Sequence, residues 1–126
     1  MPVRYVIDKE RRLVITTGEG RVSIGEMKGH QNRLLGDPDF DPSFNQLNDF
    51  TTATDVQLSG EEISAFARRD VFSPASRRAI VVSKTLHFGI ARQFEMYHGE
   101  RSIVRVFYDR EEALKWLDIP SVSRLP

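Results

Sequence analysis

The chain has 126 residues, contains no Cys, and carries 18 basic side chains that balance 18 acidic ones, so its formal net charge is zero. A length within the usual range of about 100–150 residues predicts one domain with a single hydrophobic core. The lack of Cys excludes disulfides, thiol nucleophiles and Cys-based zinc or iron–sulfur sites. Because nucleic-acid-binding domains normally carry a basic excess, we expect no nucleic-acid partner.

Membrane insertion is not expected from the sequence. No stretch of about 18 consecutive apolar residues is present, and the first residues lack the apolar run of a signal peptide. We therefore expect a cytoplasmic protein without integral membrane association.

The first third of the chain has the pattern of a β-hairpin followed by a helix. Apolar and polar residues alternate over 3–8, and a second apolar run covers 13–17. Gly18-Glu19-Gly20 is interpreted as the turn that ends this strand, because a nucleotide-binding loop would need a third glycine. Ser23, followed three residues later by Glu26, predicts the start of a helix. The helix should end at Gly36 and bury an apolar stripe made of Ile24, Met27, Leu34 and Leu35.

The middle of the chain predicts a strand, a helix and another strand. An acidic, Pro-containing loop over 37–42 leads into a strand over 44–50. Ser59 and Glu62 repeat the capping pattern and start a helix that buries Ile63, Phe66 and Ala67, with Pro74 in its exit loop. Residues 79–82 form an unbroken apolar run, which is typical of a parallel strand covered on both faces and placed near the centre of a sheet.

The last part of the chain predicts a helix, a strand and a final helix. A helix begins at Ser83 or Thr85, ends at Gly99, and carries an apolar face made of Leu86, Ile90, Phe94 and Tyr97. A strand over 103–108 and a helix capped by Asp109 complete the domain, which we place at residues 1–119 with a tail over 120–126. The order ββαβαβαβα predicts an α/β fold with a single mixed, mostly parallel five-stranded sheet and helices packed on it.

Metal and cofactor sites are not predicted. Asp37, Asp39 and Asp41 have the spacing that opens a calcium-binding loop, but Pro42 and Asn48 occupy the positions where that loop needs Gly and Glu. The histidines, His30, His87 and His98, form no pair at helical i, i+4 spacing, so we expect surface or capping roles for them.

Two pairs of arginines bracket the segment from 70 to 76. They are Arg68-Arg69 and Arg77-Arg78. Together they could recognise an anionic group, because guanidinium groups bind carboxylate and phosphate in a bidentate manner. The alternative is a solvated rim without function.

The element order, together with Asp49-Phe50-Thr51 at the end of the third predicted strand, resembles the SpoIIAA-like family within the STAS fold. The resemblance covers 3–117, with further similar stretches at 39–47, 72–74 and 77–78. It implies a small bacterial protein from a group of mostly unassigned function, related to the anti-sigma-factor antagonists. In those antagonists a strand-end Asp is followed by a phosphorylated Ser or Thr, positions that correspond here to Asp49 and Thr51, whereas Thr52 replaces a Gly. The alternative for Thr51 is a strand-end hydroxyl that bonds a loop amide.

Three classes of function remain open. The resemblance implies first a regulatory or protein-interaction domain without enzymatic activity. It implies second a binder of a small apolar or amphiphilic molecule, with a pocket between sheet and helices lined by Phe66, Phe72, Phe88 and Phe94; the alternative is that these rings fill a core. The third class is an enzyme with its active site beyond the carboxyl ends of the strands, at 49–58, 83–87 and Asp109.

We also expect a homodimer, because an open sheet leaves two edge strands and often covers an apolar face by two-fold association. Trp116 is the candidate contact, since it lies beside the stripe of Ala113, Leu114 and Leu117 on the last helix. The alternative is that Trp116 packs at the margin of its own sheet.

Overall fold

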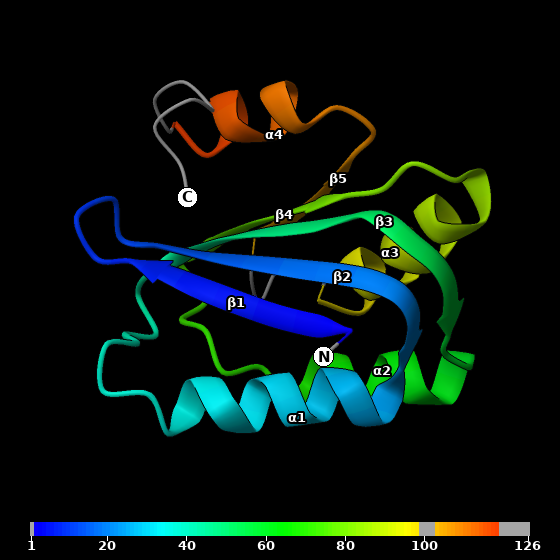
Figure 1. Cartoon of the computed structure of the whole chain (residues 1–126), viewed down its shortest axis with the longest axis horizontal. Coiled ribbons are helices and arrows are strands. Elements are labelled where there is room, and N and C mark those ends of the chain that lie inside the picture. The colour runs from blue at the N-terminus through cyan, green and yellow to red at the C-terminus, as the bar shows by residue number, and fades with distance from the viewer. Residues whose placement is uncertain (1, 99–102, 119–126) are drawn as a thin grey trace.

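The computed structural model describes residues 2–98 and 103–118 (Figure 1). Over these residues the element order is ββαβαβαβα, as predicted. The strands are β1 (Val3–Asp8), β2 (Leu13–Ser23), β3 (Asn45–Gln57), β4 (Arg77–Val81) and β5 (Ile103–Phe107). The helices are α1 (Ile24–Leu35), α2 (Gly60–Arg68), α3 (Thr85–His98) and α4 (Arg110–Trp116). The predicted helix end at Gly99, the domain end at 119 and the tail over 120–126 lie outside the described residues.

The strands form one sheet in the order β1-β2-β3-β4-β5. β1 is antiparallel to β2, and the other neighbouring pairs are parallel, which confirms the mixed, mostly parallel sheet. The central strand is β3, and β4, which contains most of 79–82, lies directly beside it, so the prediction that this run lies near the centre is confirmed. β4 is covered on both faces, because each parallel crossover places a helix against the sheet.

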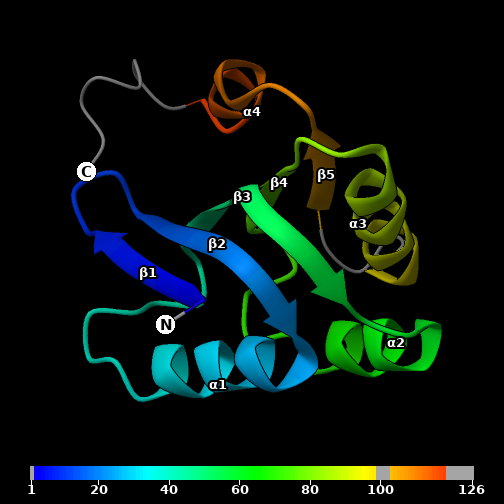
Figure 2. The same ribbon diagram turned by 45° about the vertical axis from the view of Figure 1, so that its right-hand side comes forward.

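The helices divide unequally between the two faces of the sheet (Figures 1 and 2). α4 alone lies on one face, which we call the α4 face. α1, α2 and α3 lie on the other, which we call the three-helix face. Successive side chains of a strand point to opposite faces, so neighbouring residues of β3 serve different layers. Leu47 packs in the cluster beneath α4, whereas Phe50 packs in the cluster beneath the three helices.

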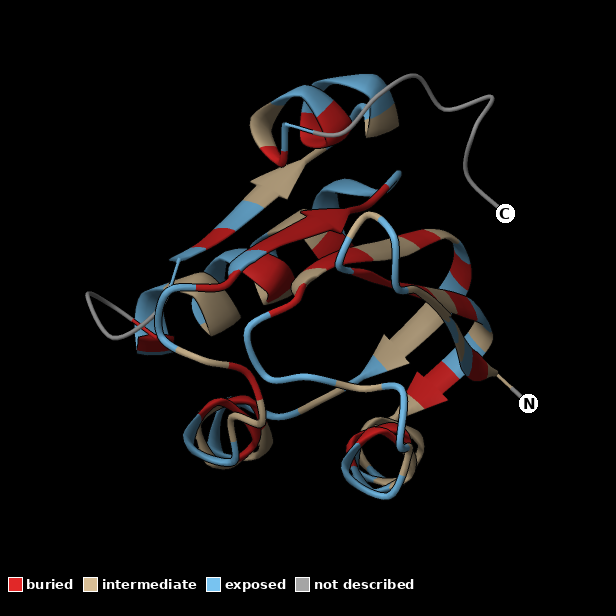
Figure 3. Cartoon of the chain, turned by 90° about the vertical axis from the view of Figure 1, so that its left-hand side faces the viewer, coloured by how far each residue is buried: buried red, intermediate tan, exposed pale blue. Residues whose placement is uncertain are grey.

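Burial follows this layering. In Figure 3 the buried residues gather where strands and helices face one another, and the exposed ones lie on the outer sides of the helices. The cluster beneath α4 joins Leu13, Leu47 and Val81 to Leu114 of the helix. The clusters beneath the other helices contain fully buried Val22 and Leu34 but also enclose polar side chains. The two layers therefore differ in the polarity of their buried side chains as well as in their number of helices.

The Gly18-Glu19-Gly20 segment does not end a strand, contrary to our prediction. β2 runs through it to Ser23, with register shifts relative to β3 on either side of Gly20. A Cβ at Gly18 would lie 2.6 Å from Cδ1 of Phe50, so only glycine leaves room for that ring. Gly20 has a φ of 61°, which glycine adopts at little cost in a bulge. The lack of a side chain at Gly18 therefore lets the ring of Phe50 pack against β2, and Gly20 allows the bulge in that strand.

Because β2 continues, β3 continues with it. β3 extends to Gln57 rather than stopping at residue 50, so the predicted active-site loop over 49–58 is mostly strand. β5 ends at Phe107, one residue earlier than predicted. Ser59 and Glu62 form the complete capping box expected for α2, whereas Ser23 makes only its own half of the motif.

The buried faces of α1 and α3 are rotated from the predicted ones. Leu35 of α1 is 60% exposed and Leu86 of α3 is 73% exposed, although both were assigned to apolar stripes. His30 and Gln31 of α1, and His87 and His98 of α3, are buried instead. The prediction of surface or capping histidines was therefore wrong. These polar side chains are buried because the space that they face contains hydrogen-bonding groups.

Candidate functional site

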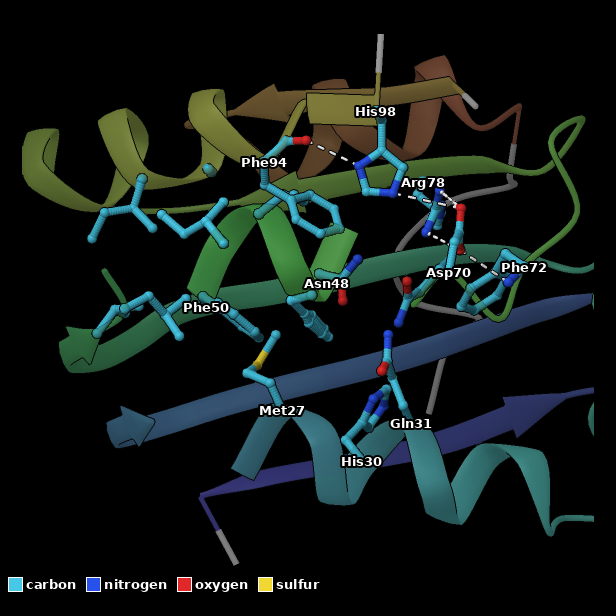
Figure 4. A pocket seen from close by; sticks show the side chains of 18 of the residues that line it. Met27, His30, Gln31, Asn48, Phe50, Asp70, Phe72, Arg78, Phe94 and His98 are labelled. Carbon is cyan, nitrogen blue, oxygen red and sulfur yellow. Dashed lines mark hydrogen bonds and ion pairs between the residues drawn. The ribbon is translucent and has the colours of Figure 1, made fainter. Parts of the chain in front are cut away.

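A pocket of about 90 Å³ lies on the three-helix face, between the sheet and the inner sides of α1, α2 and α3 (Figure 4). Each helix contributes one side to it. On α3 the lining residues are His87, Ile90, Ala91, Phe94 and His98, a spacing that follows a single helical face. The sheet contributes Gln46, Asn48, Phe50 and Val56 of β3 and Arg78 and Ile80 of β4.

Much of the lining is apolar. Met27 of α1, Phe50 of β3 and Phe94 of α3 approach the pocket from three sides (Figure 4). Phe66 of α2 lies in contact with Phe94, with ring centroids 5.8 Å apart. This part of the site offers no charged group and suits a hydrocarbon.

The opposite part of the lining holds a buried ion pair. Nη1 and Nη2 of Arg78 donate to the two carboxylate oxygens of Asp70 at 2.7 and 2.6 Å, and the guanidinium lies over the ring of Phe72. Arg78 is only 4% exposed. Burial alone would raise the pKa of Asp70, but hydrogen bonding from His98 and the charge of Arg78 outweigh it, so the pKa is lowered. Burial lowers the pKa of Arg78, yet a guanidinium remains charged in proteins.

His98 completes this polar group. Its Nδ1 lies 2.9 Å from the carbonyl oxygen of Phe94, and its Nε2 lies 3.5 Å from Oδ2 of Asp70. A carbonyl only accepts hydrogen bonds, so Nδ1 carries a proton and is the donor of this hydrogen bond. The ring is thereby held with Nε2 toward the carboxylate.

Gln31 lies across the pocket from His98. Its Nε2 donates to the carbonyl oxygen of Arg69 at 3.1 Å, which fixes the orientation of the amide. Its Oε1 is buried and has no hydrogen-bond partner among the described residues. Asn48 of β3 also lines the pocket and donates to the carbonyl oxygen of Ala79 at 3.3 Å.

His30 belongs to a hydrogen-bonded chain that reaches the sheet. Nε2 of Gln46 donates to Oγ1 of Thr16, which lies 2.9 Å from Nε2 of His30. Burial, with a smaller effect of nearby Arg33, lowers the pKa of His30 to about 4. The imidazole is therefore neutral near pH 7 and shares a hydrogen bond with the Thr16 hydroxyl.

His87 occupies the first turn of α3, at the other end of the lining. It is 3% exposed, and its Nδ1 has no hydrogen-bond partner within 2–98 and 103–118. Burial, followed by the charge of Lys84, lowers its pKa. Signals for His30, Gln31, His87 and His98 were present in the sequence, because at three- or four-residue spacing they share helical faces with the apolar residues Met27, Leu34, Ile90 and Phe94.

Of the four phenylalanines predicted to line a pocket, three do so in the structure. Phe66, Phe72 and Phe94 lie in the lining. Phe88 does not belong to it: its ring stacks on Tyr108 with centroids 4.5 Å apart. Phe50 was missing from the assignment, because a strand that ended at residue 50 gave no reason to place its ring against three helices.

The four arginines do not form one anion site. Arg68 donates to Ser64, and Arg69 donates to Asn32 on α1. Arg77 points to the α4 face, donates to the carbonyl oxygen of Trp116 at 2.8 Å and lies over its ring. Arg78 points to the opposite face, because adjacent residues of a strand alternate. The prediction that the pairs meet at one anion was wrong.

Asp49 and Thr51 lie together on the α4 side of β3 rather than at the end of a strand. Oδ1 of Asp49 accepts from the backbone N–H and the hydroxyl of Thr51 at 3.0 and 2.6 Å, and Oδ2 accepts from Nη1 of Arg110 at 2.6 Å. Burial would raise the pKa of Asp49, but the bonds from Thr51 and Arg110 prevail and lower it. Thr52 is exposed and donates to the carbonyl oxygen of Gly18 at 3.2 Å. The strand-end placement of this motif was therefore wrong.

Trp116 is half-buried and packs inside its own chain. Its ring lies 5.7 Å from that of Phe107, and Arg77 covers another side. These contacts agree with the alternative that Trp116 packs at the margin of its own sheet. The homodimer stays a prediction.

The described residues offer neither a metal site nor a membrane-spanning helix. They contain no group of three or more His, Asp or Glu side chains placed to hold a metal ion. Of the helices described, none has the length and hydrophobicity needed to cross a bilayer.

The fold and the pocket define an α/β domain with a mixed five-stranded sheet and a partly polar pocket under three helices. No family model and no curated protein matches the chain. Among solved structures, it is similar to an uncharacterized protein of the DUF3478 family with a SpoIIAA-like fold, from Shewanella loihica PV-4. The identity is 16%, the TM-score is 0.61, and the match covers 91% of each chain. The chain therefore has a SpoIIAA-like fold, as the sequence resemblance implied.

Proposed function

We propose that this protein is a binding domain that holds a small molecule with an apolar body in the pocket between the sheet and α1–α3. The observation that carries this proposal is the pocket itself, in which apolar rings and buried polar side chains face the same space. Binding sites for small molecules are typically apolar with a few fixed polar groups that set orientation. We assign no chemical step to the site.

The polar lining distinguishes this pocket from an imperfectly filled core. A buried ion pair and unpaired polar atoms cost stability, and an apolar replacement of similar volume is often neutral or stabilising. Arg78, Asp70 and Gln31 therefore add little to folding that Leu or Met would not supply. Their presence around one cavity favours recognition of a polar group on a ligand.

The volume limits the size of the ligand. A volume of about 90 Å³ corresponds to about three water-sized groups at roughly 30 Å³ each, whereas sites for drug-sized ligands measure about 300–1,000 Å³. A short chain fits directly. A longer one requires the lining to move, and Met27, with its flexible thioether, is the side chain best suited to do so.

Titration with linear 1-alkanols from propanol to octanol, followed by NMR of the isotope-labelled protein, tests this proposal. We expect saturable shifts of pocket-lining residues, with the affinity passing through a maximum as the chain length increases. Ala91→Leu places three more carbon atoms in the pocket and should abolish binding, whereas Ala75→Leu on an exposed loop should not. The proposal fails if no alkanol gives a saturable shift, or if Ala91→Leu binds as well as the unchanged protein.

A second proposal is the regulatory, protein-binding role. Exposed apolar side chains favour it: Leu86 is 73% exposed and Tyr108 is 52% exposed, both beyond the carboxyl ends of parallel strands. We rank it second because Thr51 lies within a strand, where its hydroxyl is bonded to Asp49. A partner captured from a bacterial lysate should be lost with Leu86→Glu and kept with Met96→Glu, an equally exposed position near the other end of α3. Equal capture by both variants would count against this role.

A further inference from the structure

The chemistry of the pocket narrows the class of ligand, an inference that rests on the proposed binding function. Some polar atoms of the lining are not satisfied by other side chains. Oε1 of Gln31, Nδ1 of His87 and Nε2 of His98 are buried without a hydrogen-bond partner among the described residues, and Nε2 of His98 lies 3.5 Å from Oδ2 of Asp70. Only one of them makes a definite demand on a ligand.

That atom is Oε1 of Gln31. The amide orientation is set by the bond from its Nε2 to the carbonyl oxygen of Arg69, because a carbonyl cannot donate. Oε1 therefore faces away from that carbonyl, and Gln31 is only 7% exposed. A carboxamide oxygen only accepts, so its partner must carry an O–H or N–H group. Nδ1 of His87, in contrast, either donates or accepts depending on the tautomer.

The two permanent charges in the lining, those of Asp70 and Arg78, are paired with each other. Arg78 donates two bonds to Asp70, which satisfies both carboxylate oxygens and neutralises the guanidinium. His30, the other titratable group beside Gln31, is neutral near pH 7. A carboxylate or ammonium group that entered this space would leave its water shell without gaining an unpaired opposite charge, which is strongly unfavourable.

The outline of the lining favours a linear body. His87 and His98 mark the two ends of the α3 face that lines the pocket, and eleven residues of helix span about 16 Å. Between them this face presents Ile90, Ala91 and Phe94. A ligand that contacts this face from end to end would be extended along α3.

We propose that the ligand is an uncharged, linear amphiphile whose polar end is a hydrogen-bond donor, an alcohol or amide, bonded to Oε1 of Gln31 with its hydrocarbon chain along α3.

Two isomeric probes and one charged probe test this proposal. 1-Hexanol and 1-methoxypentane have the same atoms, but only the alcohol donates a hydrogen bond, and hexanoate carries a charge at neutral pH. We expect 1-hexanol to bind about tenfold more tightly than the ether, because the ether leaves a buried acceptor unpaired. Hexanoate should bind more weakly than the alcohol. The side-chain amide resonances of Gln31 should shift with the alcohol and not with the ether.

Variants at two glutamines sharpen the test. Gln31→Met keeps the length of the side chain but removes the acceptor, so the alcohol and the ether should then bind about equally well. Gln57→Met is the matched control, because Gln57 is exposed and does not line the pocket, and it should keep the preference. If Gln31→Met does not fold, the amide resonances of the unchanged protein decide the question.

Different results separate this inference from the function on which it rests. If the ether or hexanoate binds as tightly as the alcohol, or if the preference persists in Gln31→Met, the head-group assignment is overturned while ligand binding stands. If none of the three probes shifts pocket-lining residues, and no other alkanol does, both the assignment and the binding function are overturned.

Discussion

The two faces of the sheet are formed by the same strands but differ in the side chains that they bury. On the α4 face, Leu47 and Val81 meet Leu114 in an apolar cluster, and the ion pair of Arg110 and Asp49, with side chains 30% and 13% exposed, lies on the same face. On the three-helix face, the next residues of the same strands, Asn48 and Arg78 among them, surround a cavity. A face made only for stability buries apolar groups and leaves charges at the rim. A face that encloses a buried ion pair is less stable than one filled with well-packed apolar groups of similar volume.

The largest expected effect comes from breaking the buried pair on the three-helix face. Asp70→Asn removes the carboxylate charge that Nη1 and Nη2 of Arg78 bind in a buried site, which should lower the free energy of unfolding by about 3–5 kcal/mol. The double variant Asp70→Leu with Arg78→Met removes both charges and should recover most of this loss. Urea denaturation measures both changes. A double variant no more stable than Asp70→Asn would contradict the assignment of the loss to the broken ion pair.

The histidine on this face should make stability depend on pH. The unfolded chain binds a proton on His30 near pH 6.5, whereas the folded protein binds it only near 4. Between these values the unfolded state holds more protons, so stability is fully present above pH 6.5 and falls as the pH is lowered toward 4. At about 1.4 kcal/mol per pKa unit the loss is about 3 kcal/mol. The lowered pKa of His87 adds in the same direction.

The contribution of His30 is isolated by comparison with His30→Gln. Glutamine cannot titrate, but it still offers an oxygen to the hydroxyl of Thr16. Denaturant unfolding at a series of pH values should show a flatter dependence for the variant between pH 6.5 and 4. Parallel curves for the two proteins would show that His30 does not titrate with the lowered pKa.

A methyl group at Gly18 tests how the pocket face is shaped. The added Cβ would lie 2.6 Å from the ring of Phe50, so Gly18→Ala should destabilise the protein by about 1–3 kcal/mol through overpacking and should displace that ring from the pocket. Thermal unfolding and the aromatic NMR signals of Phe50 measure the two effects. Gly60→Ala, where a Cβ meets nothing within 4 Å, is the control. Unchanged stability in Gly18→Ala would mean that β2 and β3 adjust without strain.

The smallest effect is expected on the α4 face. Arg110→Gln removes the ion pair with Asp49, whose partners are 30% and 13% exposed, so solvent screens the loss. We expect a decrease of about 1 kcal/mol or less in the free energy of unfolding. Arg92→Gln, which removes the more exposed pair with Glu95, serves as the control for a surface pair. A loss from Arg110→Gln comparable to that from Asp70→Asn would contradict the prediction that the two ion pairs differ in their contribution to stability.

The sequence by itself determined the order of the elements and the class of fold. Alternation over 3–8, the unbroken apolar run at 79–82 and the capping pattern at Ser59 are local signals, and each one specified the element that formed. Local backbone geometry and hydrophobic period act over a few residues, so they are readable without knowing what an element packs against. The SpoIIAA-like resemblance added the arrangement of these elements, which the solved structure from Shewanella loihica PV-4 confirms at the level of the fold.

Tertiary structure alone decided where strands ended and which polar groups were buried. Gly18 and Gly20 have the composition of a turn, yet pairing with β3 carries the strand through them, because long-range hydrogen bonds outweigh the local preference of glycine. The helical spacing of His30 and Gln31 with Met27 was visible, but a polar residue on an apolar face is normally assigned to the surface. Only the partners brought by distant strands and helices, such as Thr16 for His30 and Arg69 for Gln31, made their burial possible and formed the pocket.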